Sequence, residues 1–186
     1  MYKSRLKVLY QGKIVPGIME KFGLVNRMQA PKLKKIVLNI GVSAAKEDIK
    51  ILEEAKHELT LISGQSPVIT RAKKSISNFK LREGMPIGCM VTLRDSRMYE
   101  FLDRMVNFAL PRIRDFKGVS QKGFDKQGNF TLGLQDELIF PEINVNKITK
   151  PKGLSITIVT SGNPEQAMEL LRMFGLPFSK NEKLRK

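Results

Sequence analysis

The stretch KIVLNIGV, residues 35–42, alternates strictly between two sets of side chains. Successive side chains of a β-strand point to opposite sides, so the apolar set shares one face: Ile36, Leu38, Ile40 and Val42. The opposite face carries Lys35, Val37, Asn39 and Gly41. The pattern predicts a strand with one face in the core and one face left for something polar.

Four further segments have strand patterns, at residues 68–73, 88–94, 130–134 and 154–160. In the second of these, Cys89, Val91 and Leu93 point one way, and Met90, Thr92 and Arg94 point the other way. In the last, we expect Leu154, Ile156 and Ile158 to point inward and Ser155 and Thr157 outward. Small polar side chains are therefore expected on one face of the sheet.

Helical spacing appears in four segments between these strands. Residues 6–22 share a helical face that Pro16 and Gly17 interrupt, which predicts a helix that is kinked or begins late. Residues 47–62 carry the stripe Leu52, Ala55, Leu59 and Ile62. A third helix is expected from a Ser96 cap to Leu110. The last has the clearest boundaries, with Asn163 as cap, Pro164 in the first turn, Gln166 for a capping box, and Gly175 at the end.

Strands and helices are interspersed without a repeat, which predicts the α+β class. We expect a single domain over residues 1–180, followed by a basic tail at 181–186. Its sheet would be largely antiparallel, with helices on one face and a polar RNA-binding face opposite. The segments 112–129 and 135–153 are predicted to be loops.

The charge of the chain is the first indication of a partner. The 186 residues include 33 Lys and Arg against 18 Asp and Glu, a formal net charge of +15. This excess favours a polyanionic partner, and nucleic acid fits better than a membrane surface because the cations are not gathered on an amphipathic helix. The sequence has no run of about 20 apolar residues and no secretory signal pattern, and Cys89 is its one cysteine, so we expect a cytoplasmic protein.

Catalytic chemistry has little support in the sequence. The one histidine, His57, lies mid-helix and is expected to be solvated, and Cys89 is expected to be a small buried hydrophobe. Zinc-ligand spacing, phosphate-loop and dinucleotide motifs are absent. We therefore expect no catalytic residue, no metal and no cofactor. The fragment Lys122-Gly123-Phe124 begins like an RNA-recognition motif, but Asp125 breaks the pattern.

A basic stretch, RAKKSISNFKLREG at residues 71–84, joins two of the predicted strands. It is longer than a tight hairpin, so it should project from the sheet. We call residues 73–84 the basic finger. Its charge density favours contact with RNA over a merely solvated loop.

The segment ISGQSPVITRAKKSISNFKLREGMPIGCMVTLR, residues 62–94, is very similar to the central signature of the bacterial ribosomal protein family that binds 5S rRNA in the large subunit, the L5 family. KIVLNIGV, ALPRIRDFKG (109–118), FDKQGNFTLGLQDELIFPEI (124–143) and LPFSK (176–180) follow in the family's order and spacing. The resemblance covers nearly the whole chain. The chain departs from the family at Pro16-Gly17, where an unbroken helix is usual, and in six residues beyond LPFSK.

The resemblance implies a structural role in the central protuberance of the large subunit, as a monomer beside 23S rRNA and other 5S-binding proteins. It implies that 5S rRNA docks on the sheet through Asn39, Gln65 and Thr92, to which we add Lys35 and Arg94. It assigns the finger to P-site tRNA, through Lys73, Lys74, Ser77, Asn78, Phe79, Lys80 and Arg82. A bridge to a protein of the small-subunit head would involve Arg112, Arg114, Lys117, Glu142 and Asn144.

Two other classes stay open on the sequence alone. An RNA-modifying or RNA-processing enzyme would require a pocket with a perturbed titratable residue and a cofactor. A DNA-binding architectural protein would prefer duplex DNA to 5S rRNA in a competition experiment.

Overall fold

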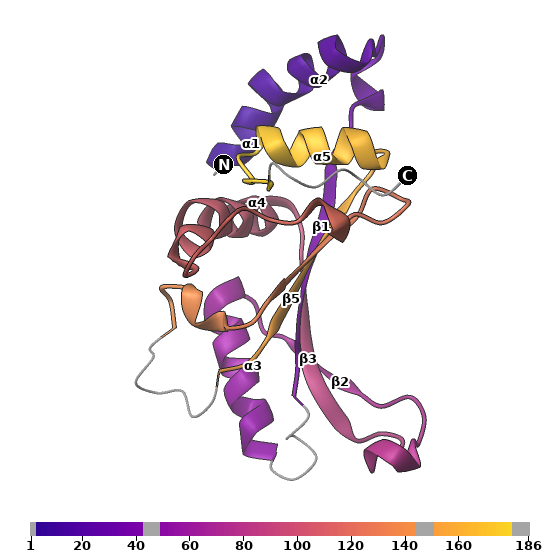
Figure 1. The fold of residues 1–186 in the computed structure, drawn as a ribbon, viewed down its shortest axis with the longest axis vertical. Helices are drawn as coiled ribbons and strands as arrows, with labels where there is room; N and C mark the ends of the chain where they lie inside the picture. The colour runs from indigo at the N-terminus through magenta and orange to yellow at the C-terminus, as the bar shows by residue number, and fades with distance from the viewer. Residues whose placement is uncertain (1–2, 43–48, 144–150, 180–186) are drawn as a thin grey trace. The chain divides into compact units, whose positions relative to one another are not determined.

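The computed structural model describes residues 3–42, 49–143 and 151–179 (Figure 1). The fold is α+β, as predicted, with an antiparallel sheet of five strands in the order β2-β3-β1-β5-β4. All of the predicted strands are present, at β1 (Leu33–Gly41), β2 (Val68–Arg71), β3 (Pro86–Leu93), β4 (Phe130–Leu134) and β5 (Leu154–Thr160). β2 ends two residues before the predicted 73, just after its register with β3 shifts between Thr70 and Arg71.

The α-helices of the described residues are α1 (Arg5–Leu9), α2 (Val15–Phe22), α3 (Ile49–Ser63), α4 (Asp95–Arg104) and α5 (Pro164–Met173). A π turn at Tyr10–Ile14 links α1 to α2, and another at Met105–Ala109 follows α4. Short 3₁₀ turns occur at Arg27–Gln29, Ser77–Phe79, Leu110–Arg112, Gln121–Gly123 and Glu137–Ile139.

Contacts within the chain group the residues into two compact units. The first unit comprises residues 1–36, 93–132 and 157–186, and the second comprises 37–92 and 133–156. β1, β3, β4 and β5 each contribute residues to both units. We describe each unit by itself.

The second unit is built around the stripe of α3 and the inward faces of three strands. Leu52, Ala55, Leu59 and Ile62 are all buried, which confirms the predicted helical face. The strands bury the side chains predicted to point inward: Leu38, Ile40, Cys89, Val91, Leu154 and Ile156. Burying apolar area of this kind contributes roughly 25 cal/mol per Å². The opposite faces of the strands in this unit are left for other contacts.

The N-terminal helix of the first unit begins at Arg5 and passes Pro16 through a π turn. Pro16 has no N–H to donate, so an unbroken α-helix would lose a hydrogen bond there. Instead, the Val15 N–H donates to the Tyr10 carbonyl, five residues back. The helix does not begin late, and the interruption that the sequence predicted is a π turn.

The start of α4 differs from the predicted Ser96 cap. Arg94 precedes the helix in extended conformation, and Asp95 is already its first residue, with a positive φ of 47°. The Met98 N–H donates to the Arg94 carbonyl at 3.4 Å, which closes the first turn two residues earlier than a Ser96 cap would. Arg94 therefore lies outside β3, although alternation had placed it on the strand. The α-helix ends at Arg104, and the π and 3₁₀ turns continue through Leu110.

The boundaries predicted for α5 are confirmed. The helix starts at Pro164, and the Gln166 side chain accepts a hydrogen bond from the Asn163 N–H at 3.4 Å, as in a capping box. Gly175 follows the helix with φ 92°, a conformation that glycine adopts without a steric penalty.

Candidate nucleic-acid interface

The non-core face of β1 and β3 in the second unit carries Asn39 and Thr92. Both residues are half-buried, and they alternate with buried residues as predicted. Within the described residues, no hydrogen bond of the protein uses the side chain of either one. Neither side chain therefore satisfies a polar group of the sheet, and both are available to an outside partner.

Gln65 joins Thr92 from the loop after α3. Gly64 turns the chain with φ 67°, and the Ser63 hydroxyl accepts a hydrogen bond from the Gln65 N–H at 3.2 Å. The Gln65 amide then lies 3.4 Å from the Thr92 carbonyl, to which its Nε2 donates. This contact is long for a hydrogen bond, but it positions the side chain beside β3. The structure therefore brings together two of the residues that the resemblance had assigned to one interface.

This sheet face also carries residues without polar side chains. Gly88 has no room for a side chain, because a Cβ there would lie 2.4 Å from the Ile40 carbonyl oxygen. Val68 pairs with Met90 across β2 and β3 and is 67% exposed. Asn39 and Thr92 are accessible as expected, and apolar side chains accompany them, so we call this surface the mixed face of the sheet.

Two further residues proposed for this interface belong to the first unit. Lys35 is half-buried on β1, and Arg94 is exposed just before α4. Both retain their cationic side chains at accessible positions.

The basic finger is held by its own hydrogen bonds. The Ala72 N–H donates to the Met85 carbonyl at 2.9 Å, and the Gly84 N–H donates to the Ala72 carbonyl at 3.0 Å. Farther out, Ile76 and Leu81 pair as an antiparallel bridge around the 3₁₀ turn Ser77–Phe79. Lys80 closes this turn in the left-handed region, at φ 50°. The finger is thus an extension of the β2–β3 hairpin with a defined tip (Figure 1).

The tip presents cations and apolar side chains together. Phe79 is 63% exposed and Ile76 is also exposed. Every finger residue that the resemblance assigned to tRNA is exposed: Lys73, Lys74, Ser77, Asn78, Phe79, Lys80 and Arg82. The sequence therefore predicted both the projection of this segment and the exposure of its charges.

The residues proposed for a bridge fall into different parts of the chain. Arg112, Arg114 and Lys117 are exposed in the first unit. Glu142 belongs to the second unit and is half-buried, with its Oε2 atom removed from solvent. Asn144 lies outside the described residues, as does the tail at 181–186.

A buried charge cluster in the second unit was not predicted. The Lys152 ammonium lies 2.8 Å from Glu58 Oε1, and both residues are at least nine-tenths buried. Glu137 is fully buried, and its Oε2 accepts a hydrogen bond from the Lys152 N–H at 2.6 Å. Burial raises the pKa of Glu137 above its usual range. No local pattern indicated this cluster, because its members are far apart along the chain and charged residues are expected to be exposed.

Burial also raises the pKa of the Cys89 thiol to about 11, which keeps the thiol protonated and unreactive, as expected of a small buried hydrophobe. His57 lies on α3, at the mid-helix position expected from the sequence. Across residues 3–42, 49–143 and 151–179, no group of three or more His, Cys, Asp or Glu residues could hold a metal ion. No helix of the described part is long and apolar enough to span a membrane.

A basic α+β chain with a mixed sheet face and an exposed cationic finger has the features of a protein that docks on RNA. Comparison with known families specifies the class, because both family models that match describe ribosomal proteins. One, described as Ribosomal protein L5, matches residues 26–82, and the other, which describes the C-terminus of the same ribosomal family, matches residues 86–178. The chain belongs to the ribosomal protein L5 family, a structural and non-enzymatic family.

Curated relatives agree over nearly the full length. The chain is 58% identical over 176 residues to a large ribosomal subunit protein uL5 of Clostridium kluyveri, covering 94% of this chain and 97% of that protein. Its identity to the protein of the same name from Caldanaerobacter subterraneus is 59% over 178 residues, covering 95% and 99%. The Geobacter sulfurreducens protein of this name is 59% identical over 176 residues, covering 94% and 98%.

Proposed function

We propose that this chain is a structural component of the large ribosomal subunit that binds 5S rRNA through the mixed face of its sheet. The observation that carries the proposal is the pair Asn39 and Thr92, which are half-buried polar side chains without a hydrogen-bond partner in the described residues. Polar groups of this kind cost little in water but become specific contacts when an RNA groove covers them. The names of the relatives support the assignment to the large subunit.

The apolar neighbours on the same face fit a groove of RNA. The shallow groove of an A-form helix presents sugar rings and 2′-hydroxyls, which contact a surface that alternates apolar and hydrogen-bonding groups. Gly88 adds no side chain to β3, where a Cβ would meet the Ile40 carbonyl oxygen of β1 at 2.4 Å. The net charge of +15 supports a polyanionic partner.

The finer assignments belong to the same proposal. The chain works in the cytoplasm as one domain over residues 1–180 and one copy per ribosome, beside 23S rRNA and other 5S-binding proteins. The finger contacts P-site tRNA, and its exposed cations support this role. Arg112, Arg114 and Lys117 contribute to a bridge to a small-subunit head protein, together with Glu142 and Asn144. The half-burial of Glu142 makes it the weakest member of that set.

The test of the sheet interface is 5S rRNA binding by Asn39→Ala and Thr92→Ala variants. Each substitution removes a hydrogen-bond partner at the interface, so the affinity should fall by about 1–3 kcal/mol, while the melting temperature stays close to that of the wild type. Filter binding and thermal unfolding measure the two quantities on the same samples.

The matched control is Gln127→Ala, which truncates an exposed polar side chain in the first unit. The control should bind 5S rRNA like the wild type. If Asn39→Ala lowers the melting temperature and leaves the affinity intact, the side chain serves the fold and the interface lies elsewhere. Duplex DNA of equal length, added as competitor, should fail to displace 5S rRNA; efficient displacement would favour an architectural DNA-binding protein.

A further inference from the structure

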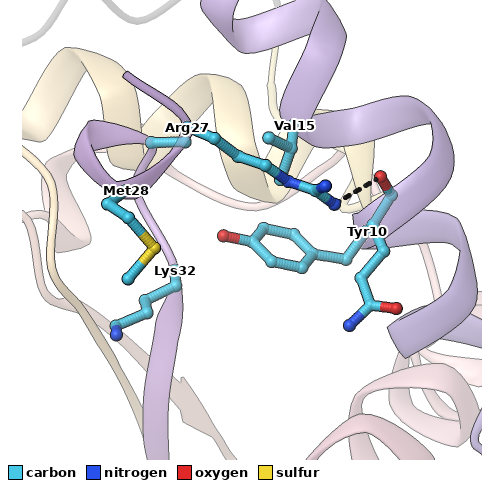
Figure 2. Close-up of a pocket in the computed structure, with 7 residues that line it drawn as sticks. Tyr10, Val15, Arg27, Met28 and Lys32 are labelled. Carbon is cyan, nitrogen blue, oxygen red and sulfur yellow. Dashed lines mark hydrogen bonds between the residues drawn. The ribbon is translucent and has the colours of Figure 1, made fainter.

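A cavity of about 430 Å³ lies in the first unit between the π turn Tyr10–Ile14 and the segment that leads into β1 (Figure 2). Its volume is within the range of roughly 300–1,000 Å³ that is typical of small-molecule sites. The lining residues come from residues 10–32, which lie within the first unit: Tyr10, Gln11, Val15, Arg27, Met28, Ala30 and Lys32.

Pro16 changes the backbone hydrogen bonding at one edge of this cavity. The Val15 N–H is directed to the Tyr10 carbonyl, and Pro16, which would be the next donor, has no N–H. The Gln11 carbonyl therefore receives no helical hydrogen bond from either residue. It accepts instead from the Arg27 guanidinium at 3.1 Å, a contact drawn in Figure 2. The bond fixes Arg27 at the edge and uses one of its five N–H donors.

The other walls are also fixed by bonds that leave the cavity accessible. The Tyr10 hydroxyl donates to the Pro31 carbonyl at 3.1 Å, and Phe174, which is not among the lining residues, stacks on its ring at 6.1 Å. Lys32 is held through its main chain: its N–H donates to the Ser161 hydroxyl at 2.9 Å, and its carbonyl accepts from the Ser161 N–H. The Lys32 ammonium is therefore not needed for the fold.

The chemistry of the lining combines positive charge with apolar surface. Arg27 and Lys32 are cationic, and none of the lining residues is acidic. Met28 is 81% exposed, which is unusual for a methionine, and its N–H is held by the Asn26 side chain at 2.8 Å in a local turn. Burial raises the pKa of Tyr10, and the positive charge of Arg27 offsets part of this rise.

We propose that this cavity binds one unstacked nucleotide of single-stranded RNA, with the phosphate at Arg27 and Lys32 and the base against Met28 and Tyr10. Guanidinium and ammonium groups are the donors that phosphate prefers, and bases are held by stacking on aromatic and apolar side chains. The inference rests on the proposed role of the chain in RNA binding. It adds a second contact, in the first unit, that is separate from the residues Asn39, Gln65 and Thr92.

The test uses a 5′-phosphorylated tetraadenylate and the full chain labelled at the methionine methyl groups. Titration should shift the Met28 methyl signal in a saturable way. Arg27→Gln should weaken the binding by about tenfold, because it removes a charge-assisted hydrogen bond to phosphate. The matched control is Lys13→Gln, which also replaces a cation by a neutral side chain. Lys13 is exposed in the first unit but does not line the cavity, so this variant should bind like the wild type.

Three outcomes would overturn the proposal. The first is that the Met28 signal shows no saturable shift, and the second is that the wild type and Arg27→Gln bind the tetraadenylate equally. The third is that a hexaglutamate peptide binds as tightly as the tetraadenylate, which would identify an acidic protein segment as the occupant. A 5S rRNA gel shift on the same samples separates the two proposals. If 5S rRNA does not bind while the tetraadenylate does, the proposed function fails and the nucleotide site stands. If 5S rRNA binds while the Met28 signal does not respond, the nucleotide site fails and the proposed function stands.

Discussion

At the scale of single residues, the charge cluster of the second unit has the largest energetic consequence. The ion pair between Lys152 and Glu58 is almost removed from water. Lys152→Met should reduce the free energy of unfolding by about 3–5 kcal/mol, because it leaves a buried carboxylate unpaired. Adding Glu58→Leu to that variant should recover much of the loss. Urea unfolding of the single and double variants measures both effects.

The control for this cycle is Lys21→Met. Lys21 pairs with Glu169 at 2.7 Å but is about half exposed. The Glu169 side chain is only 13% exposed, but Arg172 lies 3.6 Å from the same carboxylate oxygen, so Lys21→Met leaves Glu169 with a partner and should cost only about 0–1 kcal/mol. If Lys21→Met and Lys152→Met reduced the free energy of unfolding equally, the result would contradict the burial of the Lys152–Glu58 pair.

Glu137 should make the stability of the protein depend on pH. Burial raises its folded-state pKa above the ordinary value of 4.5, so the folded state binds the proton more tightly than the unfolded chain does. The stabilising contribution of this proton is present below 4.5 and is lost as the pH rises through the raised pKa. Glu137→Gln keeps an acceptor for the Lys152 N–H without the charge.

Urea unfolding at a series of pH values above 4.5 tests this expectation. The wild type should lose stability relative to Glu137→Gln as the pH increases. A constant difference between the two proteins would mean that Glu137 has an ordinary pKa in the folded state.

At the scale of elements, the finger should separate tRNA contact from 5S rRNA binding. Replacing Lys73, Lys74, Lys80 and Arg82 by Gln removes four exposed cations from a hairpin that bonds mainly to itself. 5S rRNA binding should stay near normal. P-site tRNA retention should fall for every tRNA tested, because contacts to phosphate do not read sequence, and the loss should be larger at low salt.

Filter binding of several tRNAs to reconstituted ribosomes measures this effect. The matched control replaces Lys13, Lys50, Lys56 and Lys126 by Gln, which changes the net charge equally but leaves the finger intact. Unchanged tRNA retention combined with lost 5S rRNA binding would place the finger at the 5S interface.

The elements that could be predicted are those whose signals are local. The alternation in β1 and the boundaries of α5 depend on neighbouring residues, and both are confirmed. The π turn before Pro16 could not be predicted, since the sequence shows that an α-helix must be interrupted there but not how the backbone compensates. Ser96 has the side chain of a helix cap, but the helix is capped two residues earlier, at Arg94.

The site residues show the same division. Strand alternation alone placed Asn39 and Thr92 on the free face, and charge density alone indicated the finger. The contact of Gln65 with Thr92 spans 27 positions and needed the structure. The pair of Glu58 and Lys152 spans 94 positions and contradicts the expectation that charges are exposed. Long-range pairing of polar groups is set by tertiary packing, which no local pattern encodes.

At the scale of the whole molecule, salt should have opposite effects on folding and on RNA binding. A net charge of +15 repels itself, so raising the salt from about 0.05 to about 0.5 M should increase the melting temperature of the free protein. The same change should weaken 5S rRNA binding, by about one unit or less in the log–log slope for each phosphate contact. Thermal unfolding and filter binding at matched salt concentrations measure both. A salt-independent affinity would contradict an electrostatic interface.

Lys80 at the tip of the finger illustrates a compromise between folding and function. A residue with a side chain costs roughly 1–2 kcal/mol in the left-handed conformation, and glycine would remove this cost. The chain nevertheless has a lysine there, at φ 50°. If the finger meets a polyanion, the charge gained in the complex compensates for the strain carried by the free protein. The most strained position of the finger would then be one where the demands of the partner, and not those of the fold, determined the amino acid.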